Sequence, residues 1–123
     1  MFLITVLQNA VTDCAQKQLG KPYVFGATGP NSFDCSGLAQ YCYKQAGKSI
    51  PRGATAQCQS GTAVSESAGQ PGDLVCFNQP NSPHVGIFFG VNQMIHAPKP
   101  GDVVKRSTYK WPGSLRFTGL RRI

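Results

Sequence analysis

Apolar residues near the start of the chain recur at helical spacing. Between residues 4 and 19 they are Ile4, Leu7, Val11, Cys14, Ala15 and Leu19, a pattern that places them on one face of an α-helix. Gly20 and Pro22 end the pattern. The chain therefore predicts a helix over residues 4–19. An irregular stretch over residues 20–34 follows, of the kind that often carries function.

A second helix is predicted over residues 35–46. Asp34 stands before it as a natural N-cap, and Gly47 follows it as a C-terminal stop. Leu38 and Cys42 are four residues apart, so they share one face of this helix. The sequence thus gives this segment a start, an end and a buried side.

The spacing of apolar residues changes after a short third helix that is predicted to begin at Thr55. Short apolar runs bounded by Pro, Gly or Asn predict strands, and they lie at residues 74–77, 84–89, 94–97, 103–104 and 115–117. Helices followed by strands with tight connections are typical of an α+β fold with an antiparallel sheet. The length of 123 residues is that of one domain, so we expect a single domain over residues 1–123.

Composition narrows the class of protein further. The chain is 41% hydrophobic and 14% charged, and its 14 Gly and 9 Pro follow no period, which excludes collagen, a coiled coil and a highly charged disordered chain. No apolar run approaches the ~20 residues of a membrane helix, so we expect no membrane span. The apolar N-terminus is short, lacks Lys or Arg before Lys17 and makes a poor signal peptide.

The formal net charge of +7 arises from 12 Lys and Arg against 5 Asp and Glu. Such a surplus suggests an anionic partner: a nucleic acid, an acidic membrane or an acidic polymer. The basic residues are scattered apart from residues 105–106 and 121–122, and they form no recognition-helix pattern. We therefore expect no nucleic-acid partner, and solubility alone is an alternative reason for the charge.

The cysteines are odd in number, and they lie at positions 14, 35, 42, 58 and 76. No C-x-x-C pair exists, so a zinc site lacks its usual ligand spacing. Nothing in the spacing demands a disulfide, and buried cysteine commonly behaves as a small hydrophobic residue. We expect most of the five to be core thiols, with one chemically special.

Cys35 is the candidate for that special thiol. It opens the second predicted helix, where unpaired amides and the helix dipole favour an anion and so a thiolate. The chain has two histidines, and both fall in the predicted sheet: His84 opens one strand and His96 ends another. A helix-start cysteine that faces a histidine on a sheet is the arrangement of papain-type hydrolases. The alternative interpretation is a core cysteine with structural histidines.

Six sequence segments extend this picture. They read LGKPYVFG at residues 19–26, FDCSGL at 33–38, PR with TAQ over 51–57, PGDLV at 71–75, HVGIF at 84–88 and MIHAP at 94–98. In this order and spacing the chain resembles the NlpC/P60 cysteine peptidases, which have a papain-like fold. The resemblance covers about residues 4 to 121.

The resemblance implies a catalytic role for three residues. Cys35 would be the nucleophile, His84 the general base and His96 the polar residue that orients His84. A structural role for His96 is the alternative. A two-residue turn at residues 91–92 would place His96 opposite Ile87 rather than His84, although a bulge or a longer loop can still bring the two rings together.

The resemblance also implies a binding role for five residues. Tyr23 would offer its hydroxyl to the oxyanion or the substrate, and Asp34 and Ser36 would bind the free amine of a stem peptide. Arg52 and Gln57 would line the substrate groove. Asp34 as a mere N-cap and Tyr23 as a packing residue are the alternatives.

The function implied is hydrolysis of peptidoglycan stem peptides between D-γ-glutamate and a diamino acid, meso-diaminopimelate, through a thioester. No metal or organic cofactor is expected. The expected partners are muropeptides, and the protein is expected to be a monomer. We expect an extracellular or cell-wall-facing protein, although no signal peptide is visible. The alternatives are an amidase or acyltransferase of the same fold, a non-catalytic cell-wall-binding module, and a basic nucleic-acid-binding domain.

Overall fold

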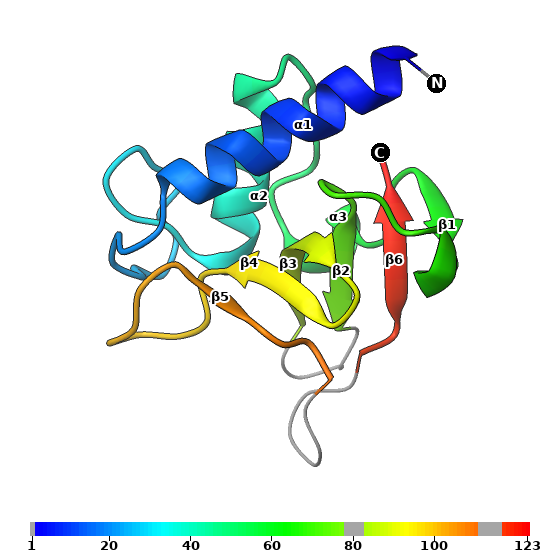
Figure 1. Ribbon diagram of the computed structural model, residues 1–123. Helices are drawn as coiled ribbons and strands as arrows, with labels where there is room; N and C mark the ends of the chain where they lie inside the picture. Colours follow the sequence, from blue (N-terminus) through cyan, green and yellow to red (C-terminus); the bar gives the residue numbers. More distant parts are fainter. Residues whose placement is uncertain (1, 78–82, 111–116) are drawn as a thin grey trace.

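Within the described residues, helices cover one face of an antiparallel sheet (Figure 1). A computed structural model describes residues 2–77, 83–110 and 117–123. The helices are α1 (Phe2–Lys17), α2 (Cys35–Gln45), α3 (Ala54–Gln57) and the 3₁₀ helix η1 (Glu66–Ala68). The strands are β1 (Thr62–Val64), β2 (Leu74–Phe77), β3 (His84–Gly90), β4 (Gln93–His96), β5 (Lys105–Ser107) and β6 (Gly119–Arg122), in the spatial order β1-β6-β2-β3-β4-β5. The predicted α+β class with an antiparallel sheet is confirmed.

The strongly periodic segments fold as predicted. Helices α1, α2 and α3 fall within about two residues of the expected ranges, and β2, β3 and β4 match the three central runs. Asp34 is the N-cap of α2, as expected, because its side chain accepts a hydrogen bond from the Gly37 amide. Among the described residues, no helix has the length and apolar character needed to cross a membrane.

The edges of the sheet differ from the prediction. Val103 makes only an isolated bridge with Pro22, and the strand there begins at Lys105. The predicted strand at 115–117 falls largely outside the described residues, and β6 starts at Gly119. Strand β1 was not predicted because it has an exposed polar–apolar pattern too short to show a period.

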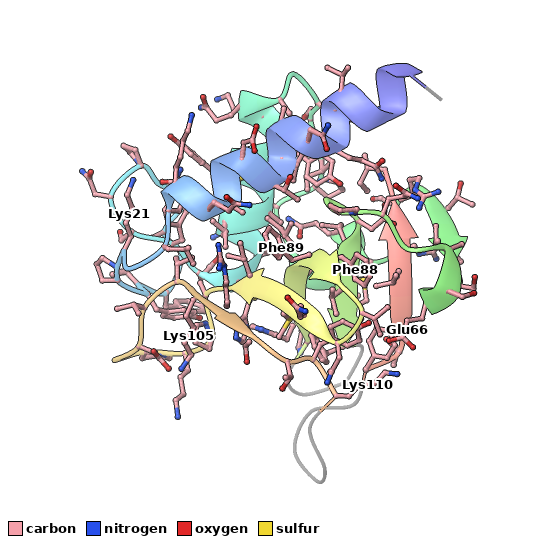
Figure 2. All side chains as sticks on the ribbon, viewed as in Figure 1. Lys21, Glu66, Phe88, Phe89, Lys105 and Lys110 are labelled. Carbon is pink, nitrogen blue, oxygen red and sulfur yellow. A yellow bond between two sulfur atoms is a disulfide. The ribbon has the colours of Figure 1, made fainter. Side chains whose placement is uncertain are left out.

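Both faces of the sheet are buried. Phe88 and Phe89, labelled in Figure 2, follow each other in β3 and pack into opposite hydrophobic clusters, because successive strand residues point to opposite faces. The helix-facing cluster includes Val11, Leu38, Cys42, Leu74 and Ile87, and the other includes Val75, Phe77, Met94, Tyr109 and Leu120. Burial on both sides explains why β2 reads as a continuous apolar run.

Four of the five cysteines form disulfides, so the prediction that most are core thiols is wrong. Cys14 of α1 is bonded to Cys42 of α2, and Cys58, the C-cap of α3, is bonded to Cys76 of β2. Packing brings the Cα atoms of these pairs to 5.4 and 5.8 Å, although the partners are 28 and 18 residues apart in sequence. Spacing along the chain cannot reveal such a juxtaposition. Cys35 keeps its free thiol.

Candidate active site

Cys35 is the first residue of α2, at a helix start that local contacts define tightly. Oδ1 of Asp34 accepts a hydrogen bond of 2.7 Å from the Gly37 amide, and the Asp34 amide donates to the Ala27 carbonyl at 2.9 Å. A Cβ on Gly37 would overlap the Ala27 carbonyl oxygen. The irregular segment before α2 therefore lies directly against its first turn, and Gly37 is required for this close approach.

The Cys35 thiol is half-buried, and burial raises its pKa. Hydrogen bonds from the backbone amides of Val85, Ser36 and Cys35 itself oppose this by favouring the thiolate, while the Asp34 charge adds to the increase. The helix start thus supplies the expected donors, but burial outweighs them. One of these amides, that of Val85, belongs to the residue that follows His84.

The two histidines form a buried pair. Nε2 of His84 and Nδ1 of His96 are 2.8 Å apart, and the rings meet edge to face with centroids 5.1 Å apart. Their exposed fractions are 7% and 2%. Since one nitrogen donates and the other accepts in such a contact, this geometry needs at least one neutral ring.

A β-bulge decides that the rings lie on the same face. Gly90 pairs with Gln93 beside the turn, but Phe88 pairs with Met94, so β3 holds one extra residue. Continued along the strands, this register sets His96 opposite Gly86 rather than opposite Ile87. Because Gly86 is two residues from His84, both histidines point to one face.

Gly86 is a site residue that sequence reasoning missed. A Cβ at this position would lie 2.6 Å from Sδ of Met94 and 3.3 Å from Cβ of His96. The missing side chain leaves room for the His96 ring to reach diagonally toward His84. Phe77, also missed, pairs with His84 across β2 and β3, and the two rings are 5.4 Å apart. Both residues can be found only once the strand register is known.

Burial lowers the pKa of both histidines. It brings the pKa of His84 to about 4. For His96 burial acts together with the charges of His84 and Lys105, against that of Asp102, and the pKa falls to about 3. Both rings are therefore neutral near pH 7, which agrees with their direct hydrogen bond.

A polar cluster lies beside the start of α2. Arg52 donates from Nη2 to Oδ2 of Asp34 at 2.8 Å and from Nη1 to Oγ of Ser36 at 2.7 Å. Oδ2 of Asp34 also accepts from the Gly26 amide. Burial opposes the charge of Asp34, but the hydrogen bonds from Arg52, Gly37 and Gly26 hold its pKa below the ordinary range. Asp34 is thus both a helix cap and the centre of an ion pair.

Tyr23 belongs to the same neighbourhood. Burial raises its pKa, as do the charges of Cys35 and Asp34, and Arg52 acts in the opposite direction. The structure therefore brings Tyr23 close to three other residues that the sequence singled out. Its backbone is held by an amide hydrogen bond to the Asp102 carbonyl and a bridge to Phe33.

Gln57 is fully buried. Its role along the substrate groove stays a prediction. Its Nε2 donates to the Ser36 carbonyl at 2.9 Å and to the Pro51 carbonyl at 2.8 Å. Gln57 therefore ties the first turn of α2 to the segment that carries Arg52. Within the described part of the chain, no three His, Cys, Asp or Glu side chains gather in a way that could hold a metal ion.

Helices packed on an antiparallel sheet, a cysteine at a helix start and a histidine on the adjoining strand together define the papain-like class. The sequence profile of the NlpC/P60 family matches residues 20–122, and the chain belongs to that family.

Two curated relatives show how far the similarity extends. A probable endopeptidase of Corynebacterium glutamicum is 51% identical over 72% of this chain and 42% of its own length. The probable endopeptidase p60 of Listeria monocytogenes is 50% identical over 71% of this chain and 18% of its own. The chain thus spans less than half the length of these relatives.

Solved structures agree with the fold. NlpC1 from Trichomonas vaginalis superposes with a TM-score of 0.83 at 32% identity, over 94% of this chain and 43% of that one. The NlpC/p60 domain of the peptidoglycan hydrolase SagA superposes with a TM-score of 0.78 at 38% identity, over 89% and 95% of the two chains. The predicted papain-like NlpC/P60 fold is confirmed.

Proposed function

We propose that this chain is a catalytic domain, over residues 1–123, that hydrolyses peptidoglycan stem peptides between D-γ-glutamate and meso-diaminopimelate. The observation that carries the proposal is the free thiol of Cys35 at the start of α2 together with the 2.8 Å contact between the rings of His84 and His96. Relatives named as endopeptidases and a structural neighbour named as a peptidoglycan hydrolase support the substrate class.

The reaction begins from a neutral thiol and a neutral imidazole, because burial disfavours both charged forms. Nε2 of His84 is engaged with His96, so Nδ1 of His84 is the nitrogen that takes the thiol proton as sulfur attacks the amide carbonyl. This assignment places the proton of the His84–His96 hydrogen bond on Nε2 of His84. His96 thereby selects the tautomer that leaves Nδ1 free to act as a base.

The tetrahedral oxyanion needs donors that already point at it. The backbone amide of Cys35 at the start of α2 is one such donor, and the Tyr23 hydroxyl is the second. His84 then returns its proton to the leaving amine, which leaves a thioester on Cys35. A water molecule activated by His84 hydrolyses the thioester and restores the thiol.

The polar cluster recognises the free amine of the stem peptide. Asp34 keeps a negative charge because Arg52 and two backbone amides stabilise it, and Ser36 supplies a neighbouring hydroxyl. Arg52 is itself bound to both side chains, so it sets their orientation. An anionic wall polymer matches the +7 net charge of the chain, and we propose that the protein acts as a monomer facing a cell wall.

The test is a digest of defined muropeptides by the wild type and by Cys35→Ser, with products identified by mass spectrometry. We expect a cut at the γ-D-glutamyl bond by the wild type only. Equal cleavage by both proteins overturns the catalytic assignment. A cut at the glycan–peptide link identifies an amidase instead, and binding without cleavage identifies a non-catalytic module.

A further inference from the structure

The disulfide between Cys58 and Cys76 joins two elements that each hold part of the candidate active site. Cys58 is the C-cap of α3, and Cys76 lies in the middle of β2. Their sequence neighbours, Gln57 and Phe77, contact the surroundings of Cys35 and His84. Each cysteine of the disulfide is therefore adjacent in sequence to a residue that contacts the surroundings of the candidate active site.

On the helix side, the contact runs through Gln57. Its buried amide donates to the carbonyls of Ser36 and Pro51, the residues next to Cys35 and Arg52. Helix α3 has four residues, too few for a helix to persist by its own hydrogen bonds. Its position therefore depends on contacts with the rest of the domain, and the disulfide adds a covalent cross-link to them.

On the sheet side, the contact runs through β2 and β3. Cys76 pairs in register with Val85, and Phe77 pairs with His84. The Phe77 ring packs on the His84 ring, and the Val85 amide favours the Cys35 thiolate by lowering the pKa of the thiol. The disulfide thus connects the element that holds the start of α2 with the strand that supports His84.

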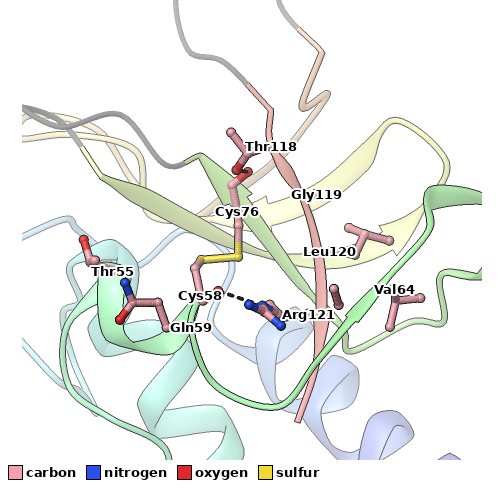
Figure 3. A pocket seen from close by; sticks show the side chains of 10 residues that line it. Thr55, Cys58, Gln59, Val64, Cys76, Thr118, Gly119, Leu120 and Arg121 are labelled. Atoms are coloured by element: carbon pink, nitrogen blue, oxygen red, sulfur yellow. Dashed lines mark hydrogen bonds between the residues drawn. A yellow bond between two sulfur atoms is a disulfide. The ribbon is translucent and has the colours of Figure 1, made fainter.

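This disulfide also borders a surface pocket of about 290 Å³, shown in Figure 3. Cys58 is half-buried, and its carbonyl accepts a 2.7 Å hydrogen bond from Nε of Arg121, which lines the same pocket. The disulfide between Cys14 and Cys42 differs, since those residues are only 7% and 0% exposed in the core between α1 and α2. Cys76 is itself only 4% exposed, so a small reductant reaches the Cys58–Cys76 disulfide through the pocket, on the side of Cys58.

We propose that the Cys58–Cys76 disulfide is a positioning cross-link that keeps Cys35 and His84 in their catalytic arrangement, and that a dithiol which reduces it lowers the activity. The dithiol supplies two electrons and two protons. The S–S bond breaks to give two thiols while the dithiol closes to its own disulfide. The activity test of this inference rests on the proposed function, because it measures muropeptide cleavage. A second test needs no substrate, because it measures the reactivity of the Cys35 thiol.

Two matched double variants test the proposal, each with one disulfide removed and Cys35 left as the free thiol. For Cys58→Ser with Cys76→Ser we expect kcat on muropeptides to fall roughly ten- to a hundred-fold, because sub-ångström alignment of the reacting groups is lost. The pH profile of Cys35 alkylation by iodoacetamide is expected to move to lower pH as the sulfur gains contact with water. For Cys14→Ala with Cys42→Ala we expect a lower Tm with kcat and the alkylation profile unchanged.

The possible results distinguish a positioning role of the disulfide from general destabilisation and from a wrong substrate. An unchanged kcat and alkylation profile in the Cys58/Cys76 variant overturns the proposal, and so do equal changes in both variants, which indicate general destabilisation. A shifted alkylation profile without muropeptide cleavage by any protein supports the cross-link and overturns the proposed substrate instead.

A second measurement uses the unmodified chain. Limiting dithiothreitol is added, thiols are mapped by differential alkylation and mass spectrometry, and activity is followed in parallel. We expect Cys58 and Cys76 to be labelled before Cys14 and Cys42, with activity falling in step and returning on reoxidation. Full activity with Cys58 and Cys76 both reduced contradicts the proposal.

Discussion

Mild acid is expected to destabilise this protein chiefly through its two histidines. His84 and His96 are buried and neutral in the folded state, with the pKa lowered from 6.5 to about 4 and about 3. In the unfolded chain each ring takes up a proton near pH 6.5. Since the unfolded state binds more protons in this range, stability falls as the pH decreases from 6.5 toward the folded-state values.

The size of the effect follows from these values. Between pH 7 and pH 5, an imidazole that titrates normally when unfolded and stays neutral when folded removes about 2 kcal/mol of stability. The two rings together remove roughly 4 kcal/mol if they act independently, against a total stability of about 5–15 kcal/mol for a typical domain. The pKa of Asp34 lies below its ordinary value, so that carboxylate stays ionised over this interval.

The measurement is urea unfolding at pH 7 and pH 5, followed by far-ultraviolet circular dichroism without reductant. The wild type is compared with His84→Asn, His96→Asn and the double variant. The chain has two histidines, so the double variant removes every imidazole. We expect it to be less stable at pH 7 but to lose little further stability at pH 5, with each single variant losing an intermediate amount. If the double variant keeps the full wild-type decrease, the burial argument is refuted.

Three further predictions concern an ion pair, a glycine and the thiol. Asp73 is fully buried and bound at 2.8 Å to Arg122, whose side chain is 27% exposed. Asp73→Asn is therefore expected to lower the free energy of unfolding by about 1–3 kcal/mol, whereas Lys110→Gln at an exposed ion pair (Figure 2) changes it by less than about 1 kcal/mol; urea unfolding distinguishes them. Gly86→Ala crowds the methionine and histidine across the strand pair, and we expect a kcat at least about tenfold lower with KM little changed; an unchanged kcat contradicts this. Burial raises the Cys35 pKa, so its alkylation rate is expected to keep rising up to at least pH 9, and a rate independent of pH between 5 and 8 would show that the thiolate forms readily.

Local patterns in the sequence are enough to determine the elements that carry the site. The helical period, the Asp34 cap and the Gly47 stop place Cys35 on the first turn of α2, because capping and periodicity involve residues within about four positions of each other. Alternating and continuous apolar runs place His84 at a strand start and His96 at a strand end. The six ordered segments indicate the family for the same reason, since each is readable without contacts between distant residues.

The tertiary structure alone decides how these residues act together. A one-residue bulge puts His96 on the face of His84, and a shift of one residue reverses every side chain of a strand. Packing converts four cysteines with uninformative spacing into two disulfides and buries Gln57 beneath the first turn of α2. Burial raises the pKa of Cys35 despite the favourable amides at the helix start, and it lowers the pKa of both histidines. Desolvation and cross-strand register depend on which distant residues surround a group, and local sequence does not contain that information.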